Sequence, residues 1–113
     1  MKYTYILCLI TLLISLTAKA AKIHQAIIDN DAACVEEVLN KEPRMIHAPD
    51  VAYGGWPPLH LAAFLGRMKI VKLLLAKGAK LNLTDIFGKT ALDHAREKYH
   101  HDVVKFLATY TRS

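Results

Sequence analysis

The chain contains a segment that repeats with a period of 33 residues, and this feature constrains the fold more than any other. The stretch GWPPLHLAAFLGRMKIVKLLLAKGA, which begins at Gly55, aligns with GKTALDHAREKYHHDVVKFLATYTR, which begins at Gly88. The matched positions carry mostly apolar or small side chains, and they include the pairs Leu59 and Leu92, Ala62 and Ala95, Val71 and Val104, and Leu74 and Leu107. Repetition at this period predicts a solenoid, in which each unit buries its apolar face against the next.

A weaker copy precedes these two, at a shift of 36 residues. Its matching positions are Ile23, His24, Ala26, Val35, Val38 and Leu39. The three extra residues fit into the connection around RMIHAPDVAYGG, which lies just before Gly55. We therefore predict three repeats, at about residues 22–50, 51–84 and 85–110, within one domain that spans residues 21–113.

The residues within one repeat predict two helices and a turn. Pro58 suits the first turn of a helix, and Gly66 suits its end. Apolar residues at helical spacing then predict a second helix with a buried stripe of Ile70, Val71, Leu74 and Leu75, which ends at Gly78. The segment LNLTDIFG has the turn residues of a projecting, hairpin-like connection. The expected fold class is therefore all-α, with about three helix-turn-helix repeats joined by short hairpin-like connections.

These motifs resemble those of the ankyrin repeat family. PPLHLAAFLG is similar to the family pattern TPLHxAAxxG, and IVKLLLAKGA is similar to IVxLLLxxGA. The resemblance covers roughly residues 22–110 and implies an ankyrin-repeat solenoid. It also implies that the chain binds other proteins through the hairpin tips and the inner faces of the first helices. The resemblance further implies that His60 bonds to the backbone of a neighbouring loop.

Departures from the pattern fall where end caps belong. In the third repeat Asp93 and Arg96 replace a histidine and an alanine, and His100, His101 and Lys105 decorate a helix with no successor. We expect these polar side chains to be exposed in a complete three-repeat domain, although a truncated longer array is an open alternative. Cys34 falls under Ile70 in the 36-residue shift, which predicts a shielded, reduced thiol.

Residues 1–20 have the plan of a cleaved secretory signal peptide, of the bacterial Sec kind. Lys2 precedes an apolar run from Tyr5 to Leu16, and small residues end the segment at Ala20. An apolar helix of about twelve residues is about 18 Å long, well short of the roughly 30 Å of hydrocarbon in a bilayer. We expect cleavage, a periplasmic or secreted location and no stable membrane anchor. An uncleaved anchor is the alternative.

Removal of this segment would leave 93 residues, with 13 basic residues against 10 acidic ones and a net charge of +3. This mildly basic balance does not predict a nucleic-acid partner. The lysines of the second repeat are expected to form a solvated helix face, the alternative being a patch for phosphate or lipid headgroups: Lys69, Lys72, Lys77 and Lys80. We expect a monomer.

The chemistry of catalysis and metal binding is not evident in the sequence. The densest titratable group contains His94, His100 and His101 with Asp93 and Asp102, but neither HExxH nor CxxC occurs. The glycines of AYGGWPP lack the Lys and the Ser or Thr of a phosphate-binding loop. We expect no catalytic residue, no metal site, no cofactor and no enzymatic activity.

The expected binding surface consists of the variable hairpin and inner-helix positions. They are Tyr53, Trp56, Phe64 and Leu65 in the second repeat and Ile86, Phe87, Lys89 and Lys98 in the third. Aromatic side chains are enriched at binding hot spots, which supports this assignment. The alternative is that Trp56 and Phe64 only cover the base of a hairpin.

The leading functional hypothesis is a periplasmic module that holds or neutralises another protein, in its most concrete form an immunity protein against a toxic effector. The alternative is an accessory factor for a periplasmic enzyme, such as a peroxide-detoxifying one. An enzyme ranks third and a secreted factor directed at a host ranks fourth. The sequence does not identify the partner.

Overall fold

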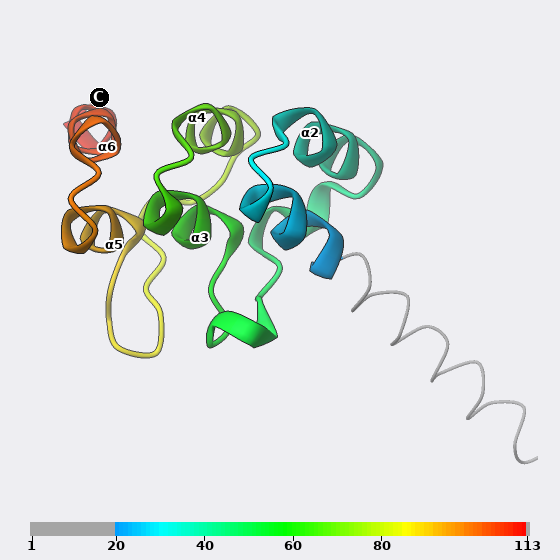
Figure 1. Ribbon diagram of the computed structural model, residues 1–113, viewed down its shortest axis with the longest axis horizontal. Coiled ribbons are helices and arrows are strands. Elements are labelled where there is room, and N and C mark those ends of the chain that lie inside the picture. The colour runs from blue at the N-terminus through cyan, green and yellow to red at the C-terminus, as the bar shows by residue number, and fades with distance from the viewer. Residues whose placement is uncertain (1–19, 113) are drawn as a thin grey trace, which may run out of the picture.

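Residues 20–112 of the chain are described by a computed structural model, and they form two parallel rows of helices (Figure 1). The inner row contains helical residues 20–28, α3 (Pro58–Leu65) and α5 (Ala91–Glu97). The outer row contains α2 (Ala32–Lys41), α4 (Met68–Ala76) and α6 (His101–Arg112). Two short 3-10 helices, η1 (Pro43–His47) and η2 (Val51–Tyr53), lie between α2 and α3. Each predicted repeat thus contains one helix of each row, and the all-α solenoid is confirmed.

The buried positions recur with the predicted register. Ile23 and Leu59 are buried in the first two inner helices, although the first repeat was inferred from a weak match. In the outer row the three aligned positions Val38, Leu74 and Leu107 are all buried. The shifts of 36 and 33 residues therefore place the same side of each helix in the core.

The first and last helices of the outer row, α2 and α6, bury their apolar side chains less completely than α4, which lies between them. Cys34 is half-buried, whereas its counterparts Ile70 and Val103 are fully buried. At the other end Val104 and Ala108 are half-buried, because no outer helix follows α6 within the described residues. The predicted shielding of Cys34 is therefore only partial: the side chain packs against the core but is half-buried, since α2 is the first helix of this row in the described part of the chain.

Local chemistry fixes where the helices begin and end. Pro58 is the first residue of α3, and Gly66 ends that helix in the left-handed conformation, with φ of 69°. Thr90 and Asp93 form a reciprocal cap at the start of α5: each side chain accepts a hydrogen bond from the backbone N–H of the other. Asp93, which replaces a histidine of the repeat pattern, therefore has a local structural role.

Two polar side chains tie each repeat to the one before it. The Arg67 guanidinium donates to the carbonyl oxygens of Ile28, at 2.7 Å, and Ile27, at 3.3 Å. Thirty-three residues later, His100 Nε2 donates to the carbonyl oxygen of Phe64, at 2.9 Å. Both contacts satisfy carbonyls at the end of the preceding inner helix. His100 is thus half-buried between repeats, which contradicts its predicted role as exposed cap polarity.

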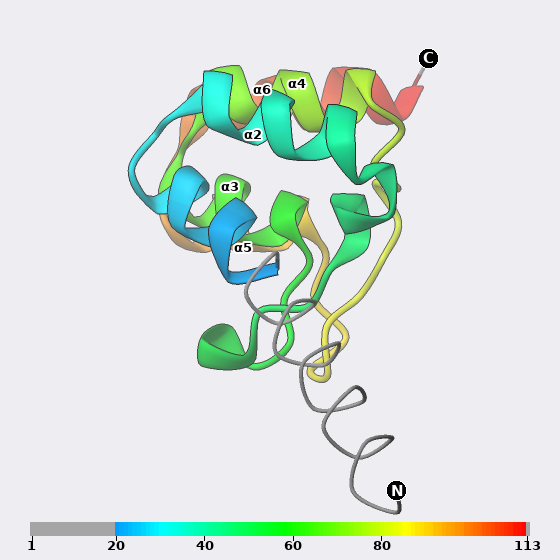
Figure 2. The same ribbon diagram turned by 90° about the vertical axis from the view of Figure 1, so that its right-hand side faces the viewer.

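Two loops project from the inner row on the side away from the outer row (Figure 2). We call residues 50–56 the first finger and residues 83–89 the second finger. Within residues 20–112 no strand forms, and the first finger is closed by a single antiparallel bridge between Asp50 and Trp56. The connection between the first and second repeats is three residues longer than the one between the second and third. Its extra residues lie in this finger or just before it, and the finger contains η2.

The predicted signal peptide lies outside the described residues, apart from helical Ala20. None of the helices formed by residues 20–112 combines the length and the apolar character needed to cross a membrane.

Candidate functional site

One buried carboxylate organises the second finger. Asp85 Oδ1 accepts hydrogen bonds from the backbone N–H groups of Phe87 and Lys89, each at 2.9 Å. Its Oδ2 accepts a hydrogen bond from His94 Nε2 of α5 at 2.7 Å, and both side chains are almost fully buried. Burial opposes ionisation of Asp85, but these hydrogen bonds outweigh it and hold the pKa of the carboxyl below its usual range. The finger is therefore a fixed platform.

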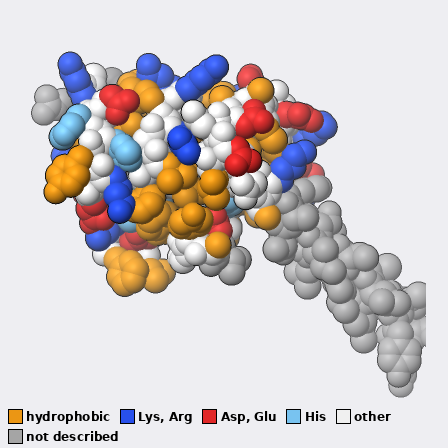
Figure 3. All heavy atoms as spheres, in the orientation of Figure 1, with side chains coloured by type: hydrophobic (Ala, Val, Ile, Leu, Met, Phe, Trp, Pro, Cys, Tyr) orange, Lys and Arg blue, Asp and Glu red, His pale blue; other side chains and the backbone are white. Residues whose placement is uncertain are grey.

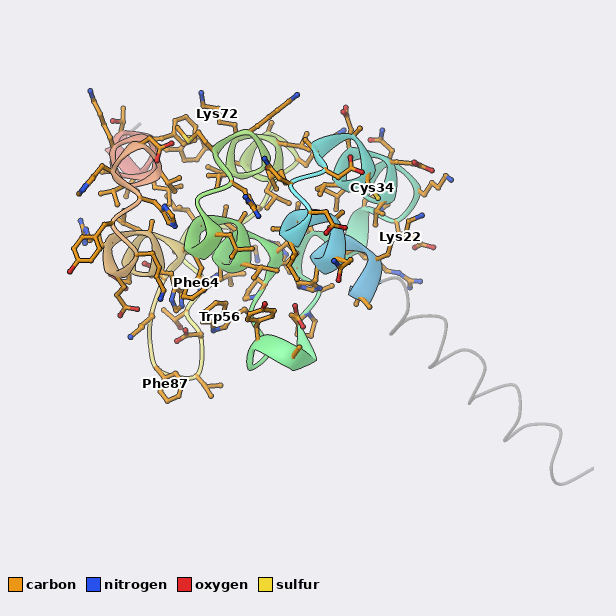
Figure 4. All side chains as sticks on the ribbon, viewed as in Figure 1. Lys22, Cys34, Trp56, Phe64, Lys72 and Phe87 are labelled. Carbon is orange, nitrogen blue, oxygen red and sulfur yellow. The ribbon has the colours of Figure 1, made fainter. Side chains whose placement is uncertain are left out.

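The platform presents two large apolar side chains to solvent. Ile86 is 78% exposed and Phe87 is 77% exposed. Phe87 lies at the far end of the second finger, away from both helix rows (Figure 4). Covering such a side chain with a partner releases about 1.5–3 kcal/mol of hydrophobic free energy. The fingertip is thus a strong candidate for a contact with another protein.

A strip of aromatic side chains runs from the first finger to the end of α3. The Tyr53 and Trp56 rings stack with centroids 5.9 Å apart, and Trp56 meets the edge of Phe64 at 5.0 Å. The centroids of the Trp56 and His94 rings are also 4.2 Å apart. The strip therefore packs against the histidine that donates a hydrogen bond to Asp85 of the second finger. Trp56 and Phe64 are half-buried, and Figure 3 shows hydrophobic side chains gathered between the inner row and the fingers.

Two lysines border this strip in different ways. Lys98, at the end of α5, is exposed and places its ammonium 4.7 Å from the centre of the Phe64 ring. Lys89, at the base of the second finger, forms an ion pair with Glu97 of α5. Only Lys98 therefore has its charge available at the edge of the aromatic strip.

The buried histidines are structural. His60 Nε2 donates to the Lys89 carbonyl oxygen at 3.1 Å, which confirms the predicted bond to a neighbouring loop. Burial lowers the pKa of His60 below its ordinary value, so the ring is neutral at neutral pH. In residues 20–112 no group of three or more His, Cys, Asp or Glu side chains is arranged to hold a metal ion.

The structure groups the predicted binding residues into two parts. Tyr53, Trp56, Phe64 and Lys98 form the continuous strip, whereas Ile86 and Phe87 form a separate fingertip. Leu65 packs against the core, and Lys89 supports the second finger. We did not predict the Asp85 and His94 pair, because the sequence marks Asp85 only as a turn residue and gives no sign of its second partner.

Stacked helix pairs with projecting, hydrophobic fingers define a repeat solenoid that binds other proteins. The chain belongs to the ankyrin repeat family: the family model described as ankyrin repeats (3 copies) matches residues 23–112.

Several curated proteins are similar to this chain over part of their length. The probable E3 ubiquitin-protein ligase XBOS33 of Oryza sativa subsp. japonica is 37% identical over 95 residues, which are 83% of this chain and 18% of that protein. The serine/threonine-protein kinase VIK of Arabidopsis thaliana is 35% identical over 81 residues, 72% of this chain and 18% of that protein. The human ankyrin repeat and SOCS box protein 3 is 34% identical over 70 residues, 62% of this chain and 14% of that protein. The chain therefore matches only a small part of each relative.

Proposed function

We propose that this chain is a non-enzymatic module that acts in the periplasm, where it holds and neutralises another protein as an immunity protein does. The observation that carries the proposal is the pairing of a second finger fixed by hydrogen bonds with an apolar tip whose two large side chains are more than three-quarters exposed. Such a tip is unfavourable in water unless a partner covers it. The location rests on the signal-like residues 1–20.

One groove of the described residues is lined by side chains that suit contact with a partner better than catalysis. A groove of about 430 Å³ near the end of α6 is lined by Leu81, Asn82, Thr90, Leu92, Tyr110 and Thr111. It contains no carboxylate, histidine or cysteine that could act as a base or a nucleophile. Two buried titratable side chains, Asp85 and His94, are instead engaged with each other and support the finger.

The first experiment tests the location. The full chain is expressed in a bacterium with a Sec pathway, the cells are fractionated, and the amino terminus of the product is determined by mass spectrometry. We expect a periplasmic product that begins directly after Ala20. An intact residue 1 in the cytosol or in membranes would contradict the periplasmic proposal.

The second experiment tests neutralisation. Proteins that bind the chain are captured from the periplasm and from the medium, and the activity of each captured protein is measured with and without the chain. Immunity predicts loss of a toxic activity and survival of cells that export the captured protein. An increase in the activity of a captured enzyme would instead favour the accessory role.

A further inference from the structure

The acidic side chains around the aromatic strip are all engaged within the chain. Asp85 accepts three hydrogen bonds, and Glu97 pairs with Lys89. Asp50 accepts from the backbone N–H of Ala52 at the start of η2, and Asp93 caps α5. Asp85, Glu97 and Asp93 are therefore already engaged by groups of this chain that would compete with a cationic group of a partner, whereas Asp50 is held by one backbone N–H.

Lys98 is the opposite case. Its ammonium lies over the Phe64 ring, and among the described residues it has no carboxylate partner. Attraction between an exposed ammonium and an aromatic ring contributes only about 0.5–1 kcal/mol, so the charge is still available for a stronger interaction. A carboxylate placed beside Lys98 would also bring its neighbouring atoms against Phe64 and Trp56.

We propose that the strip formed by Tyr53, Trp56, Phe64 and Lys98 binds a segment of a partner protein in which an Asp or Glu stands beside an apolar or aromatic residue. The carboxylate pairs with Lys98, and the apolar neighbour packs on the half-buried rings. Charge complementarity favours this class of partner, since the charge that lies on a ring of the strip, that of Lys98, is positive and has no ion-pair partner among the described residues. The proposal rests on the proposed protein-binding function and names the chemistry of the partner.

The test uses a phage-displayed library of random linear peptides selected on the full chain. Three baits are compared: the natural chain, Lys98→Glu, and Lys105→Glu as a control of equal charge change on exposed α6. We expect peptides selected on the natural chain to be enriched in Asp or Glu next to an apolar or aromatic residue. Lys98→Glu should reverse the enrichment towards Lys and Arg, whereas Lys105→Glu should leave it unchanged.

Affinity measurements then separate the contribution of the Lys98 charge from that of side-chain packing on the aromatic rings. One acidic peptide from the selection is titrated against Lys98→Met, which removes the charge but keeps an apolar chain over Phe64. We expect about a tenfold loss of affinity and a weaker dependence on salt than in the natural chain, since an ion pair is screened by salt. Circular dichroism of each variant establishes that it is folded.

Two results would overturn the proposal in distinguishable ways. Selected peptides without acidic bias, whose binding is nevertheless lost in Phe64→Ala, would show that the strip binds protein but not an acidic segment. Peptides that bind equally well to folded Phe64→Ala and to the Ile86→Ala and Phe87→Ala variants would show that this face is not the binding surface at all.

Discussion

Gly66 offers the sharpest test of how the repeats are joined. An alanine there would adopt the left-handed conformation, and its Cβ would lie 2.6 Å from His100 Nδ1 and 2.7 Å from His100 Cε1. The ring is not free to move away, because its Nε2 donates to the Phe64 carbonyl oxygen. The substitution therefore has two costs: the strain of a left-handed backbone, and the loss of the hydrogen bond between His100 and Phe64, which joins two repeats.

The two contributions can be separated. Left-handed backbone costs an alanine about 1–2 kcal/mol, and a lost hydrogen bond of this kind costs about 0.5–1.5 kcal/mol. Gly66→Ala should therefore destabilise the domain by about 1.5–3.5 kcal/mol. Gly78 is the matched control: its φ is also positive, at 97°, but an added Cβ would meet no atom within 4 Å. Gly78→Ala should cost only the strain, about 1–2 kcal/mol.

Urea unfolding followed by circular dichroism measures these values, and a double-mutant cycle with His100→Ala completes the test. In the His100→Ala background, Gly66→Ala should cost no more than Gly78→Ala does, because the ring is gone. Equal costs for the two glycines in the natural background, with no coupling to His100, would refute the proposed close contact between α3 and the start of α6.

Leu74→Ala should lower the free energy of unfolding by about 2–5 kcal/mol, because Leu74 is fully buried; a loss below about 0.5 kcal/mol in urea unfolding would place it on the surface. The half-buried Cys34 thiol should react with a thiol reagent more slowly in native protein than in denaturant, and equal rates would show that it has no core contacts. Stability should fall on acidification in two stages. Below about pH 6.5 the unfolded chain takes up protons on His60 and His47, whose pKa values are lowered by burial in the folded protein, and below about pH 4 it takes up a proton on Asp85, whose folded pKa is held down by hydrogen bonds. Urea unfolding from about pH 8 to pH 3 checks both stages, and a constant stability through the histidine range would contradict the first.

Much of the fold could be predicted, because the repeat period reports which side of each helix is buried. The register of Val38, Leu74 and Leu107 follows directly from the two shifts. The period also carried a signal that was not used: Arg67 and His100 are 33 residues apart, and equivalent positions in a solenoid make equivalent contacts. Cys34 is less buried than its repeat position predicts, because the period does not indicate where the stack of helices ends.

The site was less predictable, because loop positions do not repeat. The sequence could place Ile86 and Phe87 in a projecting turn, but the exposure of both side chains depends on how Asp85 closes that turn. The sequence predicted Trp56 as part of the binding surface. Its contact with His94 shows that it also supports the second finger, so Trp56→Ala alone cannot separate the two roles.

The central claim is that the fingertip binds the partner, and it is tested most directly with the double variant Ile86→Ala and Phe87→Ala. A protein captured as described above is titrated calorimetrically against the natural chain, this variant and Tyr99→Ala. Tyr99 is a matched control, because it is 77% exposed but lies in the connection between α5 and α6. We predict that the fingertip variant loses about 2 kcal/mol or more of binding free energy, roughly 30-fold in affinity, with an unchanged melting temperature, and that Tyr99→Ala binds normally. Natural affinity in the folded fingertip variant would contradict the account.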